Sequence, residues 1–477
     1  MSLKKQAIYG IKWTTTTSVI NSVVQIVQLA ILARLLDPTD FGLMALVMAV
    51  IEFSQMFIDM GISNAIIYRQ KISTQQLSTL YWLNIIIGIF LFILLYILSP
   101  LISRFYEDDN LTPLLILVAA TFLIKPWGQQ FMVLLQKKLE FDHIAKTDIS
   151  SRLISFIIVI ILAFNNYGVY SLAIGSVVFA FFSTLGYIYF GSKLHKPRMY
   201  FKLSDLKDFL SFGLFQMGEK ILQYFANQFD TIMIGKVLGM EILGIYNVAK
   251  NLVSKPSSII NPVITKVTFP LMSQLSNQVE YIKIVFLKIT NLLSYINVPI
   301  YFTLLFFAEP VVKIFFGNEW MSTVPLIRII SMTYLLKALV NPSGSLLLSQ
   351  GKANIAFFWK LSTVILYPTF ILIGRYWGII GIAVSLLLLQ FILFFPNWRI
   401  IVNRICKIKF WEYTKNMLIP LIYTIVPLIF AKILSFRIIN PFLELGIALF
   451  AYFMILIPMN FIFNKTIILE FKGLLFK

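Results

Sequence analysis

The sequence contains very few residues of the kinds that bind metals or form disulfides. Its single cysteine, Cys406, rules out a disulfide within the chain, and its two histidines, His143 and His195, leave almost nothing for a metal site. The phosphate-binding pattern GxxxxGK[ST], the HExxH pattern, paired catalytic carboxylates and the nucleophile elbow are missing as well. We therefore expect no cofactor, no enzymatic activity and no transport powered by the chain's own ATP hydrolysis.

Charged residues are also scarce. They make up 13% of the 477 residues, whereas hydrophobic residues make up 59%, and a soluble domain has about twice that charged fraction. Such a composition is typical of an integral membrane protein that crosses the bilayer many times. The net charge of +19 would suggest nucleic acid in a soluble protein, but basic cytoplasmic loops explain it better here, so no nucleic acid is expected.

Fourteen apolar segments of helix length follow one another, separated by short polar breaks. The lysine and arginine excess falls on one side of the membrane at almost every crossing. We therefore expect an all-α, multi-pass protein of the cytoplasmic membrane, with both termini and the basic stretch 193–207 in the cytoplasm. No cleavable signal peptide is expected, because the first apolar run is long. The segments lie near 10–35, 41–60, 79–99, 112–135, 149–165, 168–190, 208–234, 242–265, 284–308, 323–348, 354–375, 378–400, 416–435 and 441–463.

One stretch of the sequence occurs twice. ARLLDPTDFGLMALV at 33–47 aligns without a gap with GKVLGMEILGIYNVA at 235–249, 202 residues later, so that Gly42 matches Gly244. Further motifs repeat in the same order, which makes the repeated unit six segments long. Because six is even, both copies start on the same side and form two parallel lobes. We predict an N-terminal lobe at 1–195, a linker at 196–207, a C-terminal lobe at 208–403 and an appendage of two extra helices at 404–477.

Each copy of the repeat opens with an apolar helix that carries a polar stripe. Spacings of four, four and three residues place each stripe on one face of its helix. Polar side chains are costly where no water reaches them, so the stripes should face neither lipid nor a dry core. The first stripe is Thr17, Asn21, Gln25 and Gln28, and the second is Glu219, Gln223, Asn227 and Asp230.

Two lysines occupy equivalent positions in the fourth and tenth segments. Lys125 aligns with Lys337, and each lies at least ten residues from either end of its segment. At ~1.5 Å per residue this depth is about 15 Å, too deep for comfortable snorkelling. A single buried lysine commonly pairs with an acid, but two at matched depth favour a site for an anion.

The resemblance to known proteins rests on four motifs: LARLLDPTDFG at 32–42, FIDMG at 57–61 with Ala65 and Arg69, LSTLYWLN at 77–84, and FDTIMIG at 229–235. As a set they resemble the polysaccharide-export branch of the multidrug/oligosaccharidyl-lipid/polysaccharide flippase superfamily, and most of all the Wzx-type flippases. The likeness covers roughly residues 1–400. It implies two six-helix lobes around a central cavity that opens alternately to each side.

The resemblance also implies a substrate. This is an oligosaccharide on undecaprenyl pyrophosphate, for capsule, exopolysaccharide or O-antigen, moved from the cytoplasmic to the outer leaflet. Lys125 and Lys337 then become candidates for binding the pyrophosphate, with Lys220 and Lys360 as further cations to test. Expected partners are this lipid-linked oligosaccharide, membrane lipids and, beyond them, a polymerase or glycosyltransferases.

Four acidic residues within the apolar segments are candidates for coupling to a proton or sodium ion. Glu219 and Asp230 either have this role or balance a nearby lysine, and the two alternatives stay open. Glu52 is the deeper acid of the second segment and a candidate for the cavity wall. Asp59 lies nearer the cytoplasmic end, where pairing with Arg69 or helix capping is favoured.

Two other functions remain as alternatives. A cation-coupled multidrug exporter of the same superfamily would share the fold, but the lysine pair would repel cationic drugs. A scaffold that recruits polysaccharide synthesis enzymes through basic loops has no need for a wet interior, so the polar stripes argue against it.

Overall fold

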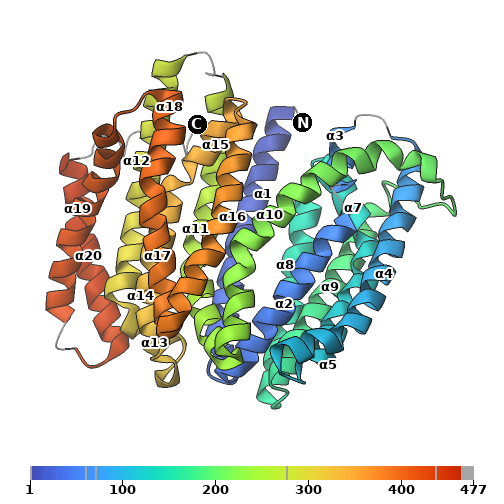
Figure 1. The fold of residues 1–477 in the computed structure, drawn as a ribbon, viewed down its shortest axis with the longest axis horizontal. Helices are drawn as coiled ribbons and strands as arrows, with labels where there is room; N and C mark the ends of the chain where they lie inside the picture. The colour runs from blue at the N-terminus through green and yellow to red at the C-terminus, as the bar shows by residue number, and fades with distance from the viewer. Residues whose placement is uncertain (1–2, 60–61, 70–71, 275–277, 436–437, 464–477) are drawn as a thin grey trace. The chain divides into compact units, whose positions relative to one another are not determined.

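The structure, a computed structural model, describes residues 3–59, 62–69, 72–274, 278–435 and 438–463, and these residues form helices and connecting turns without a strand (Figure 1). Each of the fourteen predicted segments falls on a helix or on a run of consecutive helices, which confirms the all-α fold class. The long helices are α1 (Leu3–Leu32), α2 (Pro38–Asp59), α4 (Thr74–Tyr106), α8 (Phe141–Phe164), α9 (Val169–Gly191), α10 (Lys207–Leu238), α11 (Met240–Gln274), α12 (Val279–Phe306), α14 (Thr323–Val340), α16 (Ala353–Gly374), α17 (Gly378–Asn397), α19 (Phe410–Ser435) and α20 (Pro441–Phe463).

Shorter elements connect or interrupt the long helices. They are α3 (Ile62–Tyr68), α5 (Leu111–Ala119), α6 (Thr121–Ile124), α7 (Pro126–Lys137), α13 (Ala308–Phe315), α15 (Pro342–Ser349) and α18 (Asn403–Cys406), with single turns η1 (Leu203–Asp205), η2 (Asn318–Trp320), η3 (Arg375–Trp377) and η4 (Trp398–Val402). In the described residues, nine stretches are long and apolar enough to cross a membrane, or ten if the bent pair of α5–α6 and α7 is one span. One of the nine, 354–406, contains both α16 and α17.

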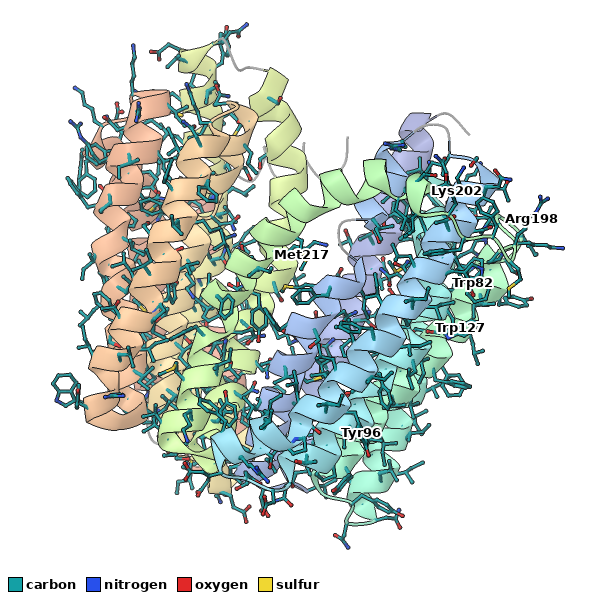
Figure 2. All side chains as sticks on the ribbon, turned by 45° about the vertical axis from the view of Figure 1, so that its right-hand side comes forward. Trp82, Tyr96, Trp127, Arg198, Lys202 and Met217 are labelled. Carbon is teal, nitrogen blue, oxygen red and sulfur yellow. The ribbon has the colours of Figure 1, made fainter. Side chains whose placement is uncertain are left out.

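Helix α4 shows how the sequence sets the ends and the faces of a span. Ser73 caps its start in a reciprocal capping box: the Gln76 N–H donates to Ser73 Oγ and the Ser73 N–H donates to Gln76 Oε1, each at 3.1 Å. Ile86, Phe90 and Ile93 follow at spacings of four and three and are about half exposed or more, as is Tyr96, labelled in Figure 2. Apolar side chains exposed along one face of a long helix are those of a surface that meets lipid.

The chain divides into two compact units, 1–247 and 248–477. In the first unit α8 packs against α1 and α9, α4 packs against α5, and α7 packs against α9. Helix α10, which begins the second copy of the repeat, packs against α2 and α3 in this same unit. The predicted lobes follow the repeat, and their boundary stays a prediction.

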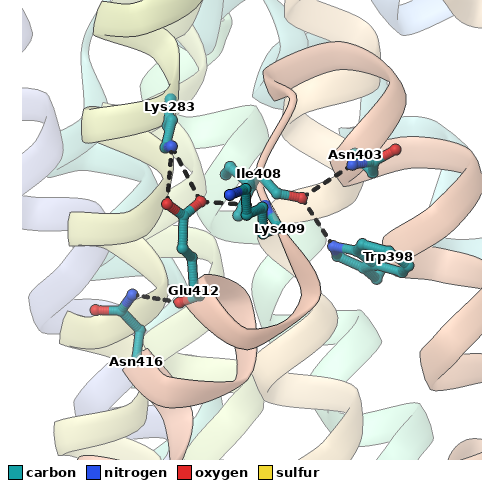
Figure 3. Close-up of polar contacts among 7 residues, drawn as sticks. All are labelled: Lys283, Trp398, Asn403, Ile408, Lys409, Glu412 and Asn416. Carbon is teal, nitrogen blue, oxygen red and sulfur yellow. Dashed lines mark hydrogen bonds and ion pairs between the residues drawn. The ribbon is translucent and has the colours of Figure 1, made fainter.

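In the second unit α12 packs against α14 and α19, and α16 packs against α17. The first residues of the predicted appendage, 404–477, make polar contacts with α12 and with the residues after α17, as Figure 3 shows. The Ile408 carbonyl accepts hydrogen bonds from Trp398 Nε1 at 3.0 Å and from Asn403 Nδ2 at 3.1 Å. The Glu412 carboxylate pairs with Lys283 of α12 at 3.0 Å. Side-chain contacts therefore hold α19 against both α12 and the end of α17.

Candidate functional site

Lys125 lies at a sharp bend in the fourth span. Because Pro126 has no N–H, it cannot donate to the carbonyl of Phe122, and the helix axis turns by 50° between α6 and α7. Gly88 of α4 leaves room for that carbonyl, since a Cβ atom at position 88 would lie 2.4 Å from the Phe122 oxygen. Pro126 and Gly88 together thus determine the position of the bend at which Lys125 lies.

The half-buried side chain of Lys125 points towards helix α2. Its Nζ donates to Gln55 Oε1 at 3.3 Å, and it is attracted by the carboxylate of Glu52, one helical turn away from Gln55. The guanidinium of Arg152 on α8 repels it. The charge of the lysine is therefore compensated by a neutral amide and a nearby carboxylate.

From Glu52 the polar contacts continue to α10 and α11. Gln228 Nε2 donates to Glu52 Oε2 at 2.7 Å, and Thr231 Oγ1 donates to Gln228 Oε1 at 3.2 Å. The Thr231 N–H and the Tyr246 hydroxyl both donate to Asp230, each at 2.8 Å. This polar chain connects Glu52 and Asp230, two of the residues predicted from the sequence, through hydrogen bonds within the first unit.

A second charged cluster lies beside Lys125 on α8 and α9. The Tyr187 hydroxyl donates a short hydrogen bond to Asp148, and Asp148 in turn attracts Arg152. The Arg152 guanidinium lies 4.2 Å from the centre of the Phe179 ring, in a cation–π contact. This cluster was not predicted from the sequence, because the expected fifth span began just after Asp148. Opposite charges four residues apart on an apolar helix were the signal for it.

In the second unit, Lys337 is surrounded by tyrosines. Its Nζ lies 5.2 Å from the ring centre of Tyr334 and 5.1 Å from that of Tyr367, and Gln390 Nε2 donates to the Tyr367 hydroxyl at 2.7 Å. Lys360 lies seven residues before Tyr367 on α16, hence two turns away on the same face. The ammonium group of Lys337 therefore makes cation–π contacts with two tyrosine rings.

The two lysines keep the equivalence that the sequence predicts. Lys125 is fourteen residues after the start of α5 and twelve before the end of α7. Lys337 is likewise fourteen residues after the start of α14 and twelve before the end of α15. The two lysines are therefore equally far from the ends of their helical segments. Their neighbours differ, because Lys125 lies near an amide and a carboxylate whereas Lys337 lies near two tyrosine rings.

The remaining predicted residues differ in how far they are exposed. Thr17 of the first stripe is buried and donates to the Trp13 carbonyl at 2.9 Å, and the buried Oδ1 of Asn21 accepts no hydrogen bond from the described residues. The side chains of Asp59 and Glu219 lie outside the described residues. Gln25, Gln28 and Lys220 are half-buried, and Gln223 and Asn227 are exposed. The roles assigned to these residues stay predictions.

Histidine, cysteine and acidic side chains do not gather into a group of three or more that would hold a metal ion anywhere in the described part of the chain. The ionisable side chains that come together around Lys125 and Asp230 are lysine, arginine, tyrosine and carboxylates.

Residues 31–325 match the family described as polysaccharide biosynthesis protein. The chain is 35% identical over 368 residues to the teichuronic acid biosynthesis protein TuaB of Bacillus subtilis, covering 77% of this chain and 76% of that protein. It is 31% identical over 421 residues to the lipopolysaccharide biosynthesis protein WzxC of Escherichia coli, covering 88% and 86%.

Two solved structures share the fold. The lipid II flippase MurJ, in an inward closed conformation, matches with a TM-score of 0.76 at 16% identity, covering 97% of this chain and all 100% of that one. A multidrug resistance MATE family transporter of the MOP superfamily, in an inward-facing conformation, matches with a TM-score of 0.58 at 14% identity, covering 80% and 94%. At such identities the likeness concerns the fold alone.

Proposed function

The chain belongs to the family of polysaccharide biosynthesis proteins, and from this premise we propose that it is a flippase for a lipid-linked oligosaccharide. The observation that carries the proposal is the match over most of the chain to relatives whose names place them in teichuronic acid and lipopolysaccharide biosynthesis. A protein named as a lipid II flippase has the same fold. The proposed substrate is an oligosaccharide on undecaprenyl pyrophosphate, moved from the cytoplasmic to the outer leaflet.

The pyrophosphate is the part of this substrate that the site must carry through the apolar layer. An isolated charge at mid-membrane costs about 2.5–3.5 kcal/mol on insertion scales. Lys125 and Lys337 lower that cost by providing one cation from each copy of the repeat, with Lys220 and Lys360 as additional cations. Gln55 accepts a hydrogen bond from Lys125 and Glu52 attracts it, so both residues would have to give way to the pyrophosphate in this proposal.

Transport proceeds by alternating access in this proposal, with the two predicted lobes opening the cavity to each side in turn. Asp230, held by Tyr246, and Glu219 are the candidates for binding a proton or sodium ion that drives the cycle. Both termini and the linker face the cytoplasm, where the lipid-linked oligosaccharide is built. A glycosyltransferase before the flippase and a polymerase after it are the expected partners.

Depletion of the protein in cells that make the polysaccharide tests the proposal. The expected result is an accumulation of lipid-linked oligosaccharide in the inner leaflet and a loss of polysaccharide at the surface, both reversed by the intact chain. A normal surface polysaccharide with no accumulation would overturn the proposal. A loss of polysaccharide without accumulation would point to the scaffold function instead, because assembly would then fail before transport.

A further inference from the structure

The basic linker between the two copies of the repeat is held against the start of α4. Trp82 Nε1 donates to the Arg198 carbonyl at 2.9 Å, and the Arg198 N–H donates to Ser78 Oγ at 3.0 Å. The Lys202 N–H donates to Thr79 Oγ1 at 3.3 Å. All three side chains on α4 belong to the LSTLYWLN motif, to which the proposed function assigns no role. The motif therefore fixes the course of the linker backbone.

Apolar side chains of the same linker pack into the core of the first unit. Leu206 is 3% exposed and packs in a cluster with Leu80 and Val133, and Leu194 packs against this cluster. His195 is buried, and burial lowers the pKa of its imidazole, so the ring is neutral at physiological pH. We call residues 194–206 the linker strap, because both of its ends pack against this cluster and its middle is hydrogen-bonded.

The outer side of the linker strap combines apolar and basic side chains. Met199 is 90% exposed and Leu203 is 73% exposed, although neither is polar. These two apolar side chains lie four residues apart in the sequence of the strap, interspersed with the exposed residues Lys196, Arg198 and Lys202. The sequence between positions 193 and 207 contains one acidic residue, Asp205, and five basic residues: Lys193, Lys196, Arg198, Lys202 and Lys207.

The position of the linker strap along the helices is marked by two tryptophans. Trp82 and Trp127 pack edge to face with their ring centres 6.5 Å apart. Figure 2 shows both between Tyr96, further along α4, and the labelled Arg198 and Lys202. Tryptophan is enriched where the bilayer meets water. The basic side chains therefore lie just beyond the interfacial layer, at the level of lipid headgroups.

We propose that the linker strap binds anionic phospholipid headgroups of the leaflet that it touches. Lys196, Arg198 and Lys202 contact the phosphates, while Met199 and Leu203 enter the boundary of the acyl chains. Each basic residue near an anionic membrane contributes enough free energy to change binding about fivefold. A lipid surface fits better than an acidic protein, because the strap begins directly after α9, which is long and apolar enough to cross a membrane.

The test places a fluorophore at Met199→Cys in a Cys406→Ala background and titrates the detergent-solubilised full chain with mixed micelles. One series contains phosphatidylcholine alone and the other adds increasing phosphatidylglycerol. The expected result is a blue shift of emission that requires phosphatidylglycerol. Lys202→Gln should raise the midpoint mole fraction of phosphatidylglycerol about fivefold, and Lys202→Arg should restore it.

A matched control uses Tyr167→Cys, which is exposed just before the opposite end of α9, directly after the two neutral residues Asn165 and Asn166, and should show no dependence on phosphatidylglycerol. An identical blue shift with both lipids would overturn the proposal, because apolar insertion alone would explain it. No shift with either lipid would also overturn it, and protection of position 199 only by an acidic cytosolic protein would assign the surface to a protein partner. None of these outcomes depends on flippase activity.

Discussion

Gly42 and Gly244, which occupy the same position in the two copies of the repeated stretch, lie directly against each other. A Cβ atom at position 42 would be 1.8 Å from the Met240 carbonyl oxygen, and one at position 244 would be 1.7 Å from the Pro38 oxygen. Pro38 and Met240 are also equivalent in the repeat. A contact in which each copy offers the same surface to the other is two-fold symmetric. The two copies of this short stretch therefore pack against each other symmetrically within the first unit.

Replacing either glycine by alanine should destabilise the protein. The added methyl group would overlap a backbone carbonyl, which no side-chain rotation relieves, so α2 and α11 must move apart. We expect Gly42→Ala and Gly244→Ala each to cost about 1–3 kcal/mol or more, seen as a lower Tm in detergent. Gly344→Ala is the control, because a Cβ atom there meets nothing within 4 Å. Unchanged melting of both test variants would show that the helices are not in this close contact.

The ion pair between Glu107 and Lys236 gives a pH-dependent prediction. Glu107 Oε1 lies 2.8 Å from Lys236 Nζ, and this hydrogen bond lowers the pKa of the carboxyl group. A carboxylate with a lowered pKa stabilises the fold above its unfolded pKa, and that contribution is lost as the pH falls through the folded value. Glu107→Gln should therefore lower Tm slightly at about pH 7 and have no effect at about pH 3. An equal effect at both values would mean that the carboxylate charge is not involved.

The coupling role of the acids predicts a loss of transport without a loss of protein. Asp230→Asn and Glu219→Gln keep the shape of the side chain but remove its charge, so export should fall about tenfold while membrane levels stay constant. Tyr246→Phe removes the hydroxyl that donates to Asp230 and should alter the ion dependence of export more than its maximum. Normal export by both charge variants would leave these residues with a structural role only.

The orientation of the chain predicts which loops an impermeant thiol reagent reaches in intact cells. In a Cys406→Ser background, Asp108→Cys should be labelled and Lys196→Cys should not, because basic residues gather on the cytoplasmic side. Both positions should react once the membrane is permeabilised, which controls for accessibility. Labelling of position 196 alone in intact cells would reverse the topology.

The fold and the family could be predicted from the sequence because their signals are local. Apolar runs fix the helices, and the motif set that resembles Wzx-type flippases is confirmed by the family match. The contacts of the site are not local. Gln55 and Gln228 lie on different helices, and nothing in the sequence states that one approaches Lys125 and the other Glu52.

The bend at Pro126 also depends on a contact that the sequence does not reveal. A proline inside an apolar segment predicts a kink, but the placement of the freed carbonyl depends on Gly88, 38 positions earlier on another helix. Likewise, periodicity placed Asp230 on a polar face without revealing that Tyr246 and Thr231 hold it. Side-chain partners across helices therefore required the structure.

In the proposed mechanism the lysine pair carries the pyrophosphate of a lipid-linked oligosaccharide across the membrane. The most direct test reconstitutes the purified chain in proteoliposomes and measures, per folded molecule, how fast this substrate reaches the opposite leaflet. Lys125→Ala and Lys337→Ala should each slow transport about tenfold or more, and Lys→Arg at either position should retain part of it, because charge matters more than shape. Full activity per molecule in the double alanine variant would contradict the account and move the anion site to Lys220 and Lys360.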